Sequence, residues 1–258
     1  MKVVLFCGGQ GMRIRDYSDH IPKPMVPVGN HPILWHIMKY YASFGHTDFI
    51  LCLGYKGEHI KRYFIDYDER LSNDFVLDTG SGNVRLYGHD VNDWRITFLD
   101  TGLSTNIGGR LQRARPYIGD DEMFLANYSD TLANANLSEM IRRFSDKPDA
   151  VASFLCVHPP YSFHTVSLDD TDRVTAVEDV RESGVWINGG YFVLRREIFD
   201  FLNPGDELVV EGFRRLYDRQ RLYAHKHEGF WSCMDTFKEK QMLDDLFATD
   251  EPPWCQIA

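Results

Sequence analysis

A glycine-rich turn directly after the first apolar segment constrains this chain more than any other feature. Residues 2–7 (KVVLFC) form an apolar run short enough for a buried strand, and Gly8, Gly9 and Gly11 follow it at once. Because glycine has no side chain, the backbone can turn sharply there and point its N–H groups at a phosphate chain. The segment therefore predicts an anion-binding turn at the end of a first strand.

Two cations accompany this turn. Arg13 stands at the end of the turn and carries a planar guanidinium group with several N–H donors. Lys23 follows within a Pro-Lys-Pro-Met motif and carries a compact ammonium charge. The glycines alone are equally typical of an ordinary turn. The two common phosphate-binding patterns do not fit, because no Gly-Lys-Ser/Thr is present and the dinucleotide pattern needs a third glycine at position 13. The combination predicts a triphosphate site that uses both Arg13 and Lys23.

Strand-like and helix-like patterns alternate through the first 155 residues. The strand-like stretches are 48–54, 94–102, 122–128 and 150–157, and the helical ones are 31–44, 58–67, 109–118 and 136–147. Such alternation predicts an α/β fold with a mostly parallel sheet flanked by helices. Ligands bind at the carboxyl ends of such strands, so we expect the glycine turn and Asp130 at one edge. No linker or repeat interrupts residues 1–258, which predicts a single domain.

Other segments depart from this alternation. Residues 70–93 suggest a hairpin excursion, for which a flexible loop and a lid or oligomer contact are equally good interpretations. Residues 164–194 predict strand, turn and strand, and helices are expected at 207–220 and 236–247.

Composition excludes several classes of function. The formal net charge of −10 argues against a nucleic-acid surface, which needs a basic face. No apolar run reaches transmembrane length and the chain opens without a signal-peptide pattern, so we expect no membrane segment. The five cysteines are scattered without a Cys-x-x-Cys pair, which is typical of free thiols in a cytoplasmic protein.

Two aspartates are candidate metal ligands. Nucleotidyl transfer develops negative charge that proteins stabilise with Lys, Arg and Mg²⁺, and Mg²⁺ is held by one or two carboxylates plus phosphate oxygens. Asp130 follows the buried strand 122–128, and Asp235 precedes the helix at 236–247. The alternative is that Asp130 is an ordinary turn residue and that Asp235 caps its helix.

With these residues in place, nearly the whole chain resembles the sugar-phosphate nucleotidyltransferases, and within them the bacterial glucose-1-phosphate cytidylyltransferases. The motifs that carry the resemblance are GGQGMR, PKPMVPVGNHPILWHIMK, GYKG, GGRLQR, INGGYFVL and GFWSCMDTFKEK. The resemblance implies a Rossmann-like nucleotidyltransferase fold, CTP as donor, Mg²⁺ as cofactor and a phosphorylated small molecule as acceptor. Residues 1–155 would form the nucleotide-binding part and 156–258 the acceptor-binding part, and a homo-oligomer is common among relatives.

The resemblance also assigns roles to individual residues. Arg13 and Lys23 would bind the triphosphate and stabilise the transfer, while Asp130 and Asp235 would hold Mg²⁺. The other residues that would line the nucleotide are Gly8, Gly9, Gly11, Gly109 and Arg110. Asn188 and Gly189 fall where the family contacts its acceptor.

Four departures from the family pattern bear on function. Met12 replaces a threonine, and Ser129 and Thr131 replace the glycines on either side of Asp130. Asp179 replaces a lysine that binds the acceptor phosphate, and His164 replaces a glycine of the sugar pocket.

The change at Asp179 has two interpretations. Either Arg181, Arg173 or His164 supplies the missing positive charge, or the acceptor carries its own cation. In the second case, a phosphorylated amine or amino acid would pair with Glu178 and Asp179. Glucose-1-phosphate as acceptor and a catalytically inactive nucleotide-binding relative are the alternatives to a redirected cytidylyltransferase.

Overall fold

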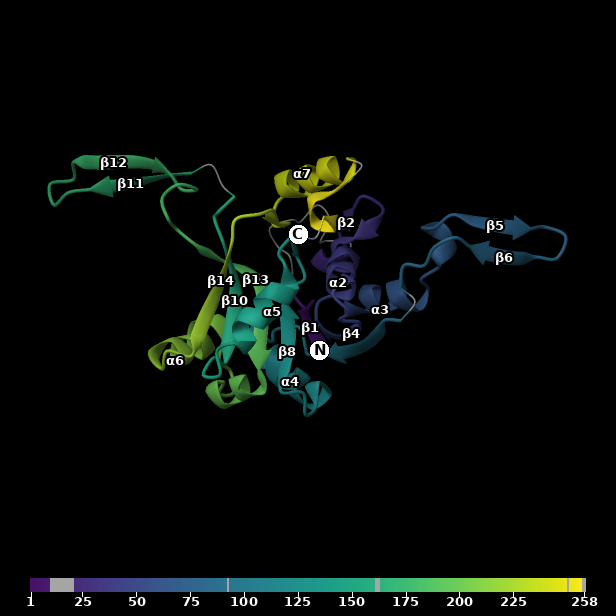
Figure 1. The fold of residues 1–258 in the computed structure, drawn as a ribbon, viewed down its shortest axis with the longest axis horizontal. Coiled ribbons are helices and arrows are strands. Elements are labelled where there is room, and N and C mark those ends of the chain that lie inside the picture. The colour runs from purple at the N-terminus through teal and green to yellow at the C-terminus, as the bar shows by residue number, and fades with distance from the viewer. Residues whose placement is uncertain (10–20, 92, 161–162, 250, 257–258) are drawn as a thin grey trace.

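A seven-stranded mixed sheet forms the centre of the molecule in the computed structural model (Figure 1). Its strand order is β14-β10-β13-β8-β1-β4-β7. The strands are β1 (Lys2–Phe6), β4 (Asp48–Leu53), β7 (Arg95–Asp100), β8 (Met123–Asn127), β10 (Ala152–Val157), β13 (Ile187–Arg195) and β14 (Leu222–His227). Within the residues that the structure describes, β13 is the only strand of this sheet that runs antiparallel to both of its neighbours, which are β8 and β10. The predicted mostly parallel α/β sheet is confirmed.

The structure describes residues 1–9, 21–91, 93–160, 163–249 and 251–256. Two predicted site residues, Gly11 and Arg13, lie outside these ranges, as does Met12. Their proposed roles therefore stay predictions, whereas Lys23 and the carboxylates are described.

Helices cover both faces of the sheet because successive residues of its strands point to opposite sides. Val3 and Leu5 pack into one core and Val4 and Phe6 into the other. The first core is shared by α2 (Ile33–Ser43), α3 (Gly57–Ile65) and α5 (Leu137–Ser145), and the second by α4 (Ile107–Ile118) and α6 (Phe213–Asp218). Buried strands between two helical layers explain the continuous apolar runs in the sequence.

Side-chain caps determine where two of the helices begin. The side chain of Asn106 accepts a hydrogen bond from Gly109 N, so α4 begins at Ile107 rather than at Gly109. Thr236 caps α7 (Phe237–Phe247) through a reciprocal capping box with Glu239. Asp235 therefore lies outside the cap, and the interpretation of Asp235 as the helix cap is wrong.

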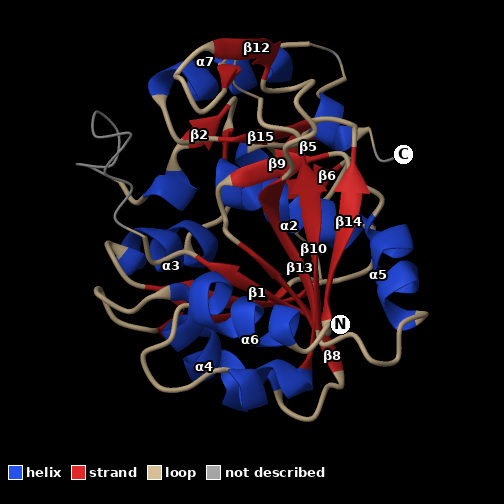
Figure 2. Ribbon diagram, turned by 90° about the vertical axis from the view of Figure 1, so that its left-hand side faces the viewer, coloured by secondary structure: helices blue, strands red, loops and turns tan. Residues whose placement is uncertain are grey.

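Small ribbons and α7 gather at one end of the sheet (Figure 2). They are the pairs β2 (Pro27–Val28) with β3 (His31–Pro32) and β9 (Thr131–Ala133) with β15 (Trp231–Cys233). Because β9 follows β8 directly, these ribbons lie over the carboxyl ends of the parallel strands. Chain segments far apart in the sequence thus meet above one edge of the sheet.

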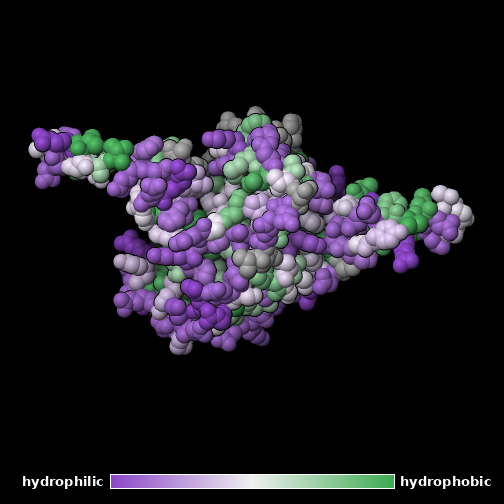
Figure 3. Space-filling view, turned by 45° about the horizontal axis from the view of Figure 1, so that its top comes forward, coloured by the Kyte–Doolittle hydropathy of each residue, from purple (hydrophilic) through white to green (hydrophobic). Residues whose placement is uncertain are grey.

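Two hairpins project from opposite sides of the body (Figure 1). One is formed by β5 (Phe75–Asp78) and β6 (Asn83–Leu86), and the other by β11 (His164–Leu168) and β12 (Val174–Asp179). Apolar side chains gather along both hairpins (Figure 3), and the exposed ones include Leu77, Val84, Val166 and Val177. The hairpin expected within residues 70–93 is confirmed, and its role as lid or oligomer contact stays a prediction.

Within the described residues, no helix combines the length and apolar character needed to cross a bilayer. The cysteines are free thiols, and four of them are buried: Cys7, Cys52, Cys156 and Cys233. Burial raises the pKa of the Cys7 thiol far above its ordinary value, so this residue serves as a core side chain.

Candidate active site

The turn after β1 is held tightly against the end of β4. Cys7 N donates to Cys52 O at 3.0 Å, and Tyr55 N donates to Gly8 O at 3.4 Å. A Cβ at Gly8 would lie 1.9 Å from the Arg110 guanidinium, so a larger residue there would displace this side chain. Gly9 is exposed, and a Cβ there would meet nothing within 4 Å. Packing therefore explains Gly8, while Gly9 is open toward solvent.

The Arg110 side chain packs against this turn and forms hydrogen bonds with it and with the neighbouring strand ends. Its guanidinium is buried and donates to Leu53 O at 3.0 Å, Thr101 Oγ1 at 2.5 Å and Gly8 O at 3.0 Å. These acceptors come from the ends of three structural segments, namely β4, β7 and the glycine turn. The structure thus gives Arg110 a bracing role, and its predicted contact with a nucleotide stays a prediction.

Lys23 joins the two candidate metal ligands. Its Nζ lies 2.6 Å from Asp130 Oδ2 and 2.5 Å from Asp235 Oδ1. Burial lowers the pKa of Lys23, but the charges and hydrogen bonds of the two aspartates outweigh it, so the pKa is raised. The ammonium is therefore charged at neutral pH. Three residues predicted separately from the sequence thus converge on one point.

The surrounding chain explains this convergence. Lys23 begins a short 3₁₀ turn (Lys23–Met25), where Val26 N donates to Lys23 O at 3.0 Å. The pairing of β9 with β15 brings the other two residues together, since Met234 N donates to Asp130 O at 2.9 Å. The Glu239 carboxylate then holds the backbone of Asp235 in place by accepting a hydrogen bond from Asp235 N at 2.7 Å.

Ser129, which stands beside Asp130 in place of a family glycine, adopts the backbone conformation that a glycine would allow. Its φ is +66°, in the left-handed region that glycine adopts most easily. The Ser129 hydroxyl donates to Phe6 O at 2.8 Å, and its N–H donates to Asn127 Oδ1 at 2.8 Å. These bonds hold the turn in the required conformation and tie the end of β8 to that of β1. The predicted shared edge for the glycine turn and Asp130 is confirmed.

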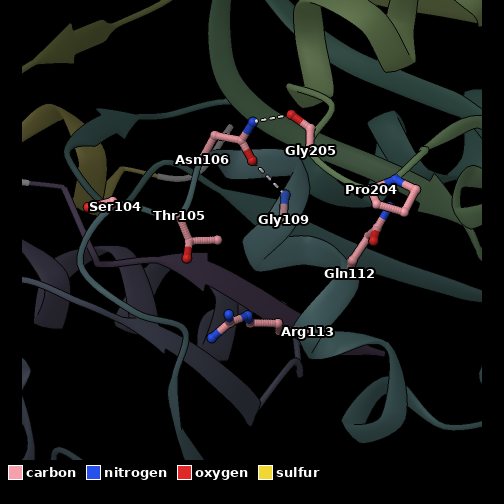
Figure 4. Close-up of a pocket in the computed structure, with 8 residues that line it drawn as sticks. All are labelled: Ser104, Thr105, Asn106, Gly109, Gln112, Arg113, Pro204 and Gly205. Atoms are coloured by element: carbon pink, nitrogen blue, oxygen red, sulfur yellow. Dashed lines mark hydrogen bonds between the residues drawn. The ribbon is translucent and has the colours of Figure 1, made fainter.

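A pocket of about 590 Å³ opens beside the start of α4 (Figure 4). Asn106 forms part of its wall, donating to Gly205 O at 2.9 Å and accepting from Gly109 N at 2.9 Å. The other lining residues are Ser104, Thr105, Gly109, Gln112, Arg113, Pro204 and Gly205. Gly108 is needed for close packing, because a Cβ would lie 2.2 Å from Asp206 O.

The start of β13 brings the predicted acceptor residues to the same edge of the sheet. Because β13 is antiparallel to β8, its first residues lie beside the carboxyl end of β8. Asn188 Nδ2 donates to the Tyr128 hydroxyl at 3.1 Å, and Trp231 Nε1 donates to Gly189 O at 2.8 Å. Neither Tyr128 nor Trp231 was singled out from the sequence, because nothing in the local pattern relates them to β13.

Asp179 lies at the inner end of the β11–β12 hairpin and forms an ion pair with Arg181. Its carboxylate accepts from Arg181 N at 2.9 Å, from Arg181 Nε at 2.9 Å and from Arg181 Nη2. The hydrogen bonds from Arg181 hold the pKa of Asp179 well below its usual range. Of the three cations considered for this position, Arg181 is the one in direct contact, while His164 is the cross-strand neighbour of Asp179.

Comparison with known proteins identifies the family. Residues 2–239 match the family model described as nucleotidyl transferase. The chain belongs to this nucleotidyl transferase family. It is 39% identical to a probable glucose-1-phosphate cytidylyltransferase of Bacillus subtilis over 98% of this chain and 99% of that protein. It is 36% identical to the glucose-1-phosphate cytidylyltransferase of Salmonella typhi over 98% of each chain.

Solved structures of this family share the fold. A UDP-glucose pyrophosphorylase complexed with UDP-glucose matches with a TM-score of 0.69 at 13% identity, over 95% of this chain and 97% of that one. A putative glucose-1-phosphate thymidylyltransferase from Bacillus anthracis matches with a TM-score of 0.68 at 16% identity, over 95% and 94%. The Rossmann-like nucleotidyltransferase fold expected from the sequence is therefore confirmed, and the chain is a nucleotidyltransferase.

Proposed function

We propose that this chain is a Mg²⁺-dependent cytidylyltransferase that joins CTP to a sugar 1-phosphate and releases pyrophosphate. The observation that carries the proposal is the convergence of Asp130 and Asp235 on the Lys23 ammonium, above the strand edge that holds the glycine turn. The cytidylyl donor and the glucose-1-phosphate acceptor are supported by the names of the relatives at 36–39% identity.

Lys23 would stabilise the charge that develops during transfer. Negative charge grows on the leaving pyrophosphate, and a buried ammonium interacts with it more strongly than one in water. Only 11% of the Lys23 side chain is exposed, so little solvent screens it. The acceptor phosphate already carries the attacking oxygen, so the reaction requires no protein base.

The carboxylate pair suits Mg²⁺. Among the described residues, no group of three or more His, Cys, Asp or Glu side chains is arranged to hold a metal ion. Two carboxylates are nonetheless a typical protein contribution to Mg²⁺, which takes its other ligands from phosphates and water. When bound, Mg²⁺ would neutralise phosphate oxygens. Asp130 and Asp235 would hold it, because both already share one cation.

The nucleotide would lie between this carboxylate pair and the pocket at α4. The pocket volume of about 590 Å³ lies in the usual range for a small-molecule site. Arg110 links the region of the pocket to the glycine turn, because it follows the lining residue Gly109 and its guanidinium donates to Gly8 O and, at 3.5 Å, to Leu103 O, next to the lining residue Ser104. We assign Gly9 and Gly109 to this nucleotide site because both lie where a ligand can approach the backbone.

The Asp179–Arg181 pair favours a sugar 1-phosphate as acceptor. Asp179 alone would repel a phosphate, but Arg181 offsets its charge and is 57% exposed on its side chain. A guanidinium held by one carboxylate still presents N–H donors to a second anion. We therefore assign the acceptor phosphate to Arg181, with Asn188 and Gly189 facing the sugar. The phosphorylated amine or amino acid that Glu178 and Asp179 would bind is the competing outcome.

The test is pyrophosphate release with Mg²⁺, comparing CTP with ATP, GTP, UTP and dTTP. Acceptors would be glucose-1-phosphate, other sugar 1-phosphates, phosphocholine-like amines and phosphorylated amino acids. We expect turnover with CTP and glucose-1-phosphate that disappears with a chelator. Turnover only with a cationic acceptor would overturn the acceptor assignment, and the absence of turnover with every pair would contradict the proposed activity.

A further inference from the structure

Lys23 occupies the place between two carboxylates that the proposed function assigns to a metal ion. Its Nζ contacts one oxygen of each carboxylate, at 2.6 Å from Asp130 and 2.5 Å from Asp235. All three side chains are largely shielded, with 11%, 23% and 15% exposed for Lys23, Asp130 and Asp235. An ammonium and a divalent cation would thus compete for the same oxygens.

The competition follows from charge and from the flexibility of lysine. Two cations repel each other at contact distance, so a metal shared by both carboxylates requires the ammonium to withdraw. The Lys23 backbone is fixed by its 3₁₀ turn and by the Val26 N hydrogen bond. Its four-carbon side chain can still swing while the backbone stays in place. A triphosphate would offer the withdrawn ammonium a new anionic partner.

We propose that Lys23 is an internal cation that keeps free divalent metal from the Asp130–Asp235 pair until a nucleoside triphosphate draws it away. This inference rests on the proposed function. Metal and nucleotide then strengthen each other's binding, because each favours the arrangement in which Lys23 has left the carboxylates, and such coupling is reciprocal. The isolated protein takes up metal weakly, and the nucleotide-bound protein takes it up well.

The experiment is a Mn²⁺ titration followed by electron paramagnetic resonance, with no nucleotide present. Lys23→Met removes the charge while keeping a side chain of similar length, and Lys23→Arg keeps the charge. Lys2→Met is the matched control, because Lys2 pairs with Asp121 at 3.0 Å at the opposite end of β1. Circular dichroism verifies that each variant is folded.

We expect Lys23→Met to bind Mn²⁺ at least about tenfold more tightly than the wild type, since a neighbouring positive charge has been removed. Adding Asp130→Asn to that variant should abolish the gain. Lys23→Arg and Lys2→Met should bind like the wild type. A folded Lys23→Met that binds no more tightly than Lys2→Met would overturn the inference.

A second measurement keeps the test decisive if Lys23→Met does not fold. Wild-type protein without nucleotide should show no tight Mn²⁺ site that depends on Asp130, and finding one would contradict the inference. A non-hydrolysable CTP analogue, corrected for its own Mn²⁺ binding, should tighten the wild-type site but have less effect on Lys23→Met. If Lys23→Met gains Mn²⁺ affinity and the analogue has no effect on the wild type, the exclusion of free metal by Lys23 stands, while the proposed CTP donor and the release of Lys23 by CTP both fail.

Discussion

Aspartates form ion pairs in both predicted parts of the site, with Lys23 in the nucleotide part and with Arg181 in the acceptor part. The two ion pairs differ in sequence separation and in burial. Lys23 contacts Asp130 and Asp235, which lie 107 and 212 positions away in the chain. Arg181 contacts Asp179 only two positions away, at the inner end of a projecting hairpin. The Lys23 side chain is 11% exposed and that of Arg181 is 57% exposed.

This difference separates a contact that requires the whole fold from one that a short segment makes by itself. The Lys23 cluster depends on the pairing of β9 with β15 and on the turn after β8. The Asp179–Arg181 pair needs only its own turn and is screened by solvent, so it contributes little to stability. We therefore expect substitutions in the first to affect catalysis strongly, and substitutions in the second to affect mainly acceptor binding.

The largest effect should come from the carboxylates that share Lys23. Asp130→Asn and Asp235→Asn should each lower kcat by roughly a thousandfold, because each removes a charge that would hold the metal at the transferring phosphate. Asp179→Asn, the matched change in the other pair, should lower kcat less than about tenfold. Pyrophosphate release at saturating CTP and Mg²⁺ measures all three variants.

Equal losses of kcat in the three variants would contradict the distinction between the Lys23 cluster and the Asp179–Arg181 pair. Thermal unfolding serves as the control, because each carboxamide variant must remain folded for its kcat to be interpreted. Asp130→Asn also removes one partner of a buried ammonium, so a modest fall in Tm is expected there.

A smaller but clear effect on stability is expected at Arg110. Arg110→Met should lower the free energy of unfolding by about 2–4 kcal/mol, because it removes the buried hydrogen bonds of the guanidinium to Thr101 Oγ1, Leu53 O and Gly8 O. Leu53 O keeps its bonds from Thr101, but among the described residues Gly8 O is left with only the 3.4 Å bond from Tyr55 N. Arg113→Met, in the same helix but exposed, should change it by less than about 0.5 kcal/mol. Urea denaturation measures both. If Arg110→Met were as stable as Arg113→Met but lost CTP affinity, the guanidinium would serve the nucleotide directly.

The sequence allowed the sheet and the edge that carries the site to be predicted, because buried strands and glycine turns have local signatures. Asp130 could be placed there for the same reason, whereas Asp235 was assigned to the site through the family resemblance. The role of Arg110 could not be predicted, since its acceptors come together only when β1 pairs with β4. The contact of Lys23 with both aspartates likewise depends on long-range pairing that no local pattern encodes.

Two contacts at departures from the family pattern were missed for a different reason. Ser129 adopts a positive φ that its residue type disfavours, and its hydroxyl bond to Phe6 O becomes apparent only in the folded chain. Replacement of the family glycine therefore suggested a loss of backbone freedom, whereas the structure supplies a compensating contact. The same applies to Arg181, whose position two residues after Asp179 offsets the charge change that the sequence comparison emphasised.

The smallest effect should distinguish the two acceptor interpretations. Arg181→Gln removes the exposed guanidinium that we assign to the acceptor phosphate, so the KM for glucose-1-phosphate should rise about tenfold, the equivalent of one charged hydrogen bond. The KM for CTP should stay unchanged. Arg173→Gln, at the tip of the same hairpin, is the matched control and should alter neither value. Steady-state kinetics with each substrate varied in turn provides the measurement.

A KM for glucose-1-phosphate that does not change would remove Arg181 from the acceptor site. A lower KM for a phosphorylated amine in Arg181→Gln would show instead that Asp179, freed from its pair, attracts a cationic acceptor.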